Sequence, residues 1–158
     1  MALMDVEQDS AQVGVPPPLM LVACVLLGLG LHGAYPIQLV PDALRFLLAL
    51  PFFAVGVGTV FSCATVFKKA KTEIKPWKTT STIITTGVYG FSRNPIYCSF
   101  VLVGASVAFA VNSLWVVLSQ VLLVVILNKL VIQKEERYLE QKFGDEYRAY
   151  KERVRRWI

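Results

Sequence analysis

Long apolar runs separated by short polar stretches dominate the pattern of residues along this chain. Between Leu19 and Val66 the only formal charges are Asp42 and Arg45, and between Ile96 and Leu127 there is none. A membrane-spanning helix needs roughly 20 apolar residues. The pattern therefore predicts about four spanning helices, over residues 19–35, 43–67, 95–111 and 114–132.

Local signals predict where several helices begin and end. Asn94 suits the position before a helix and Pro95 the first helical position, so a helix should begin there. The fourth helix should continue past the membrane to Phe143, because Gly144 is a common helix terminator. Asp145 would cap a final helix. That helix should carry three apolar-faced residues at i, i+3 and i+7: Tyr147, Tyr150 and Val154.

What remains outside the apolar runs is small. A loop over residues 68–94 and a tail over residues 133–158 leave no length for a separate soluble catalytic domain. Residues 81–90 show no helical period and are predicted to be extended. We therefore predict one all-α integral membrane domain over residues 1–158, in which loop, tail and helix ends form any site.

The distribution of charge predicts the orientation. Of the 16 Lys and Arg residues, 15 follow Phe67 and lie in the loop, near the end of the fourth span or in the tail. Basic segments remain on the cytoplasmic side of a membrane. Loop and tail should both be cytoplasmic, with two spans on either side of the loop, which also makes both termini cytoplasmic. Alternatively, Lys68, Lys69 and Lys71 serve only to orient the chain and contact anionic headgroups.

The cysteines and the histidine do not form a metal-binding pattern. Cys24, Cys63 and Cys98 are widely spaced within apolar stretches, and His32 is the only histidine. This spacing fits neither a zinc site nor a disulfide framework. We expect no metal, and we expect the cysteines to act as small packing residues.

Two polar features could carry chemistry. One is the segment 87–97 at the start of the third span, and the other is the pair Glu135-Glu136 beyond the fourth. On a regular helix Lys129 and Gln133 share a face with Glu136, while the neighbouring face carries Asn128, Ile132 and Glu135. A carboxylate beside Arg93 and several tyrosines would form a polar pocket at the lipid surface. The competing interpretation is an ordinary solvated helix.

The order of these residues resembles the isoprenylcysteine carboxyl methyltransferase family and its phospholipid methyltransferase relatives. The resemblance runs from Ser81 to the end of the chain and includes an apolar hairpin between its two halves. The residues that carry it are Gly87, Val88, Tyr89, Arg93, Pro95, Tyr97, Glu135, Glu136, Leu139, Phe143, Gly144, Tyr147, Tyr150, Arg153 and Val154.

The resemblance implies an integral membrane enzyme that uses S-adenosylmethionine at the cytoplasmic membrane face. Its acceptor would be lipid-like or prenylated, and no nucleic-acid partner is expected. Tyrosine faces would favour the sulfonium cation, by roughly 0.5–2 kcal/mol per contact. The implied cofactor-binding residues are Ser81, Thr82, Ile83, Ile84, Gly87, Tyr89, Arg93, Asn94, Pro95, Ile96, Tyr97, Glu135 and Glu136.

Two departures from the family pattern bear on the chemistry. Asn94 stands where the family usually has His, so this position can donate a hydrogen bond but cannot titrate. Val131 stands where prenylcysteine enzymes place a substrate-binding Arg, four residues before Glu135. The acceptor could therefore be a lipid amine, a thiol or another small hydrophobic molecule. The sequence assigns neither a catalytic base nor an oligomeric state.

Two other functions compete with a methyltransferase. A non-catalytic four-span protein, such as a transporter subunit or scaffold, would also lack the Arg. A coupled transporter would normally carry ionisable groups in mid-membrane, and the first three spans carry none there apart from His32. A nicotinamide-dependent membrane reductase fits least, because the paired Glu and the Phe-Gly-x-x-Tyr tail match the methyltransferases better.

Overall fold

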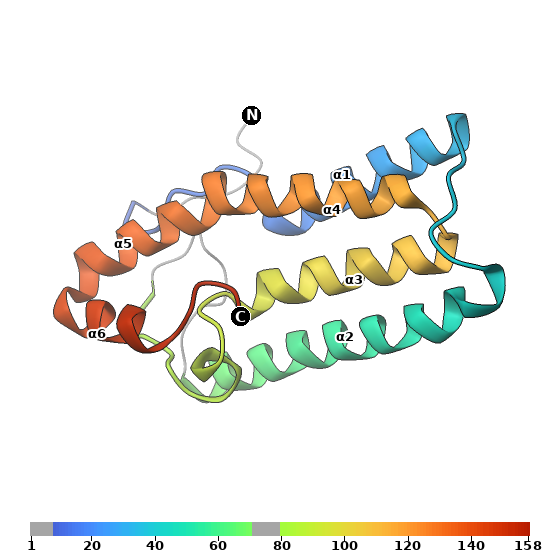
Figure 1. Ribbon diagram of the computed structural model, residues 1–158. Helices are drawn as coiled ribbons and strands as arrows, with labels where there is room; N and C mark the ends of the chain where they lie inside the picture. The colour runs from blue at the N-terminus through green and yellow to red at the C-terminus, as the bar shows by residue number, and fades with distance from the viewer. Residues whose placement is uncertain (1–7, 71–79) are drawn as a thin grey trace. The chain divides into compact units, whose positions relative to one another are not determined.

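The computed structural model describes residues 8–70 and 80–158, and the regular structure in those ranges is entirely helical (Figure 1). The all-α prediction is confirmed for this part of the chain. In order, the helices are α1 (Pro17–Ala34), η1 (Asp42–Leu44), α2 (Arg45–Ala70), η2 (Gly87–Gly90), α3 (Pro95–Val111), α4 (Leu114–Leu127), η3 (Asn128–Ile132), α5 (Gln133–Phe143) and α6 (Asp145–Arg153).

The chain divides into two compact units. The first unit contains residues Met1–Pro16, Thr59–Ile96 and Asn128–Ile158, and the second contains Pro17–Gly58 and Tyr97–Leu127. Most of the predicted site residues belong to the first unit, and Tyr97 belongs to the second. The prediction of one domain over the whole chain stays a prediction.

The helices of the second unit pack through small residues. In α1, a Cβ added at Gly28 would lie 2.7 Å from the Cα of Val116 in α4. In α2, a Cβ added at Gly56 would lie 3.0 Å from a methyl carbon of Val103 in α3. Figure 1 shows α1 beside α4, and α2 beside α3. Helices in membranes associate closely where glycine lets the backbones approach.

Asn112 joins the two connections of the second unit. Its φ of 57° lies in the left-handed region, which Asn tolerates better than most residues. Its Oδ1 accepts hydrogen bonds from the backbone N–H groups of Leu39 at 2.9 Å and Val40 at 3.0 Å. Its Nδ2 donates to the carbonyl of Val40 at 2.8 Å. One side chain therefore satisfies backbone groups that the loop could not pair internally.

Among the residues that the structure describes, three helical stretches are long and apolar enough to cross a membrane: Pro17–Ala34, Asp42–Ala70 and Leu114–Phe143. The helix α3, Pro95–Val111, is apolar but has 17 residues. The chain is thus a membrane protein by its helices. The fourth span and the cytoplasmic position of both termini stay predictions.

Several local predictions are confirmed and others are corrected. Helix α3 begins at Pro95 and α5 ends at Phe143, as predicted. Residues 87–90 form a short 3₁₀ turn instead of extended chain. Asp145 is the first residue of α6 rather than its cap, because Gly144 occupies the cap position with a φ of 54°.

The third correction concerns the faces of the helix that follows the fourth predicted span. Residues Asn128–Ile132 form a π-helical turn between α4 and α5. A π turn holds an extra residue, which rotates everything beyond it relative to a regular helix. Lys129 is consequently exposed while Glu136 is buried, so the predicted shared face is wrong.

Candidate functional site

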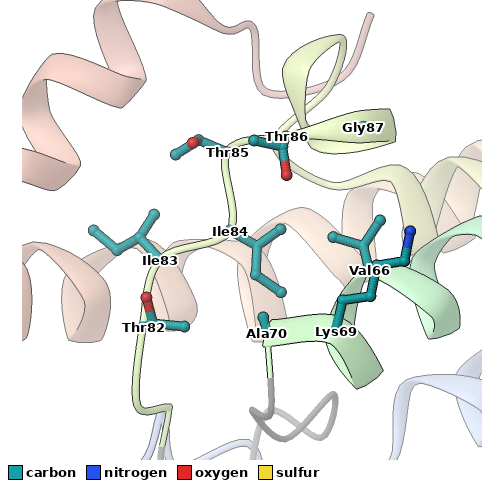
Figure 2. Close-up of a pocket in the computed structure, with 9 residues that line it drawn as sticks. All are labelled: Val66, Lys69, Ala70, Thr82, Ile83, Ile84, Thr85, Thr86 and Gly87. Atoms are coloured by element: carbon teal, nitrogen blue, oxygen red, sulfur yellow. The ribbon is translucent and has the colours of Figure 1, made fainter.

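The stretch from Ser81 to Thr86 passes between two apolar clusters of the first unit, and its side chains alternate between them. Ile84 packs with Cys63 and Tyr89, beside Val66 and Ala70 of α2. Its neighbour Ile83 packs on the other side, against the cluster that Tyr147, Tyr150 and Val154 form. Figure 2 shows the two isoleucine side chains pointing in opposite directions. Alternation of this kind is what an extended backbone imposes.

A cavity of about 570 Å³ lies between this stretch and the end of α2 (Figure 2). Pockets that hold small molecules and cofactors occupy about 300–1,000 Å³. Four predicted cofactor residues line it, together with five that the sequence did not indicate. The lining residues are Val66, Lys69, Ala70, Thr82, Ile83, Ile84, Thr85, Thr86 and Gly87.

Glycine is needed at position 87, where the cavity wall turns. Gly87 has a φ of 62°, a conformation that side chains with a Cβ rarely adopt. A Cβ there would also approach a methyl carbon of Val66 to 3.2 Å. The residue therefore contributes backbone geometry to the site.

A buried ionic cluster forms the second part of the candidate site. Nη2 of Arg93 lies 3.1 Å from Oε1 of Glu136, and their side chains are only 9% and 10% exposed. Arg156 donates two hydrogen bonds to the same carboxylate, from Nε to Oε1 at 3.0 Å and from Nη2 to Oε2 at 2.6 Å. Two guanidinium groups thus share one carboxylate.

The cluster leaves donors of Arg93 unused. Within the described part of the chain, Nε and Nη1 of Arg93 are buried and have no hydrogen-bond partner. A buried donor without an acceptor costs about 1–3 kcal/mol, more for a charged group. The two donors are therefore suited to hold a further anionic group.

Tyr89 links the loop to the tail. Its carbonyl accepts a hydrogen bond from the hydroxyl of Tyr150 at 2.7 Å, and its ring packs edge-on against Phe67. Burial raises the pKa of Tyr89, as it does that of Tyr147, and the charge of Glu135 adds to both effects. Both phenols are therefore neutral at physiological pH, and they present aromatic faces rather than anionic oxygens.

The two glutamates differ in their surroundings. Glu136 is buried in the arginine cluster, whereas Glu135 is half-buried and close enough to Tyr89 and Tyr147 to influence their ionisation. The π turn explains why Glu136, and not Glu135, points with Ile132 into the protein. Of the two glutamates that the resemblance implies, Glu135 is thus the more accessible.

The remaining predicted residues are distributed along the loop and α3. Ser81 and Thr82 are exposed, Ile96 packs on the cluster that contains Ile84, and Pro95 is buried at the start of α3. Asn94 is buried, and its Nδ2 donates to the carbonyl of Arg156 at 2.8 Å. Tyr97 lies in the second unit, where its ring contacts Phe100 edge-on.

The sequence did not indicate Arg156 as a site residue or its contact with Asn128. Arg156 looked like one of several basic residues near the end of the chain, yet its Nη1 also donates to Oδ1 of Asn128 at 3.2 Å. The pairing joins residues 28 positions apart across a chain reversal, and no local pattern announces it. Among residues 8–70 and 80–158, no group of three His, Cys, Asp or Glu side chains could hold a metal.

Comparison with known proteins identifies a family. The model of the family described as phospholipid methyltransferase matches residues 44–146. This range includes α2, the cavity loop, the Arg-Asn-Pro-x-Tyr motif and the glutamate pair, and it confirms the resemblance at the level of this family.

One curated relative is also similar. An uncharacterized protein of Haemophilus influenzae (strain ATCC 51907 / DSM 11121 / KW20 / Rd) is 51% identical over 41 residues, which is 26% of this chain. The chain spans 65% of that relative's length. No solved structure matches the chain.

Proposed function

Because the chain belongs to the phospholipid methyltransferase family, we propose that it transfers a methyl group from S-adenosylmethionine to a lipid-like acceptor. The observation that carries the proposal is the family match over residues 44–146, since it contains the residues that line the cavity and the Arg93–Glu136 pair. We place the reaction at the cytoplasmic membrane face, with both termini cytoplasmic, because the basic loop and tail favour that side.

The residues at the candidate site fit this cofactor chemically. The cavity is large enough for a small molecule, and it combines apolar side chains with the hydroxyl groups of three threonines. The two unpaired donors of Arg93 suit an anionic group such as the carboxylate of the cofactor's amino-acid part. When bound, S-adenosylmethionine supplies a methyl group on a positively charged sulfur.

The chain's own residues would then bind and align the reactants. Glu135 would accept hydrogen bonds from an amine or from ribose hydroxyls, because it is more exposed than Glu136, which pairs with Arg93 and Arg156. Tyr89 and Tyr147 remain neutral and offer aromatic faces to a cation. Alignment of nucleophile, methyl and leaving sulfur is the main contribution that such a site can make to rate.

The residue at position 131 favours a lipid headgroup over a prenylated cysteine as the acceptor. Position 131, which carries Arg in prenylcysteine enzymes by resemblance, is Val131, and it is fully buried. A buried valine provides no cation for a carboxylate substrate. We therefore propose an acceptor of the phospholipid class, such as a lipid amine, in keeping with the family.

The first experiment is a calorimetric titration of the detergent-purified protein with S-adenosylhomocysteine, the expected product. Saturable binding is expected, and it should weaken about tenfold in Glu135→Gln, the loss of a hydrogen bond to a charged group. The control is Glu146→Gln, since Glu146 is an exposed carboxylate on α6. Equal binding by both variants would reject the assigned site.

A folded wild-type protein that binds no S-adenosylhomocysteine in detergent or in lipid nanodiscs would reject the methyltransferase function. It would favour the non-catalytic interpretation of the same helices.

A further inference from the structure

The last five residues of the chain, Val154–Ile158, lie against the Ser92–Asn94 segment, and we refer to them as the C-terminal strap. After α6 ends at Arg153, Val154 turns the backbone to an extended conformation and buries its side chain with Tyr147 and Tyr150. The apolar face of α6 therefore anchors the start of the strap.

Backbone carbonyls of the strap satisfy the donors of the motif segment. The carbonyl of Arg155 accepts the backbone N–H of Arg93 at 2.9 Å. The carbonyl of Arg156 accepts from Nδ2 of Asn94 at 2.8 Å and from the hydroxyl of Ser92 at 3.4 Å. Three successive residues of the motif thus each donate to the strap.

The side chain of Arg156 makes the second set of contacts, toward the glutamate pair. It forms the two-pronged hydrogen bond with Glu136 and a third hydrogen bond with Asn128 of the π turn. The hydrogen bonds to Glu136 raise the pKa of Arg156. The planar guanidinium of arginine can donate two parallel hydrogen bonds to a carboxylate. The ammonium of lysine would keep the positive charge but could not reproduce this paired geometry.

We propose that Arg156 is a positioning residue, which holds the Ser92–Asn94 segment and the helix bearing Glu135 in register for cofactor binding. This inference rests on the proposed function. The mechanical reason is that one residue binds Asn94 through its carbonyl and Glu136 through its guanidinium, so the motif and the helix cannot shift independently. Asn94 takes part in this positioning, because its side-chain Nδ2 donates the hydrogen bond to the carbonyl of Arg156 in the strap.

The test compares Arg156→Gln with Arg155→Gln in the full-length protein. Arg155 is the adjacent residue, its side chain is exposed, and its carbonyl contact to Arg93 does not depend on the side chain. We expect Arg156→Gln to bind S-adenosylhomocysteine about 5- to 150-fold more weakly, the usual range for coupled sites. Arg155→Gln should bind as the wild type does, and Arg156→Lys should recover part of the loss.

A second readout separates positioning from general destabilisation. Hydrogen–deuterium exchange, measured without ligand, should increase in Arg156→Gln at the backbone amides of Arg93 and Asn94, while the α1 and α4 amides keep wild-type rates. The double variant Glu136→Gln/Arg156→Gln should lose less than the sum of the single losses, because both changes break one interaction.

Two results would overturn the inference. One is wild-type affinity in Arg156→Gln together with unchanged exchange at Arg93 and Asn94. The other is an equal loss of affinity in Arg155→Gln. If the wild type itself binds no S-adenosylhomocysteine, the proposed function fails, while the exchange measurement still tests whether the strap orders the motif segment.

Discussion

The hydrogen bond from Tyr150 to the carbonyl of Tyr89 should hold helix α6 on the cavity loop. The bond is 2.7 Å long, and both residues are buried. Tyr150→Phe keeps the ring, which belongs to the apolar cluster with Tyr147 and Val154, and removes only the hydroxyl. The carbonyl of Tyr89 then remains buried without that donor, which costs about 1–3 kcal/mol.

This cost should appear as local opening of α6. Hydrogen–deuterium exchange reports the free energy of local opening, so amides of α6 should exchange roughly 5- to 150-fold faster in Tyr150→Phe. The control is Tyr35→Phe, the same chemical change at a residue that is 69% exposed in the second unit. Unchanged exchange in α6, or an equal effect in the control, would refute the reasoning.

The remaining predictions concern helix packing and alkaline pH. Gly28→Ala should lower the unfolding temperature in detergent, because overpacking against Val116 costs about 1–3 kcal/mol. Gly30→Ala on the same helix should not, because nothing lies within 4 Å of the added carbon; equal shifts would contradict this. Burial raises the pKa of Tyr150 to about 12. The folded state therefore keeps a proton that the unfolded chain releases above about pH 10, so stability is complete below pH 10 and declines as pH rises through 12. Titration by tyrosinate absorbance checks this, and it fails if every tyrosine ionises near pH 10 with the helices intact.

Local signals in the sequence were sufficient for the helix boundaries. Helix α3 starts at Pro95 because proline suits the first position of a helix, and α5 ends at Phe143 because Gly144 readily adopts the backbone conformation that terminates a helix. Helical spacing correctly placed Tyr147 and Tyr150 on one face of α6. The predicted helical position of Val154 is wrong, because α6 ends at Arg153 and Val154 is extended, although its side chain still packs with the two tyrosines. The features predicted correctly are local, so tertiary contacts were not needed to predict them.

The candidate site was predictable only in part. The loop residues Thr82 to Ile84 and Gly87 do line a cavity. Val66 and Lys69 line it too, and they come from α2, the helix before the loop. The π turn could not be read from the sequence, since no propensity distinguishes it from a regular helical turn. It decides which of two adjacent glutamates is buried with arginines.

Apolar run length and residue order are properties of the chain alone, and they were enough to predict an all-helical membrane protein, several of its helix ends and its family resemblance. The tertiary structure decided that Glu136 is paired with Arg93 and Arg156 and that Asn94 binds the strap. The physical reason is burial. Charged and polar groups removed from water must find partners wherever the fold brings them, and in this protein those partners lie 20 to 62 positions away along the chain.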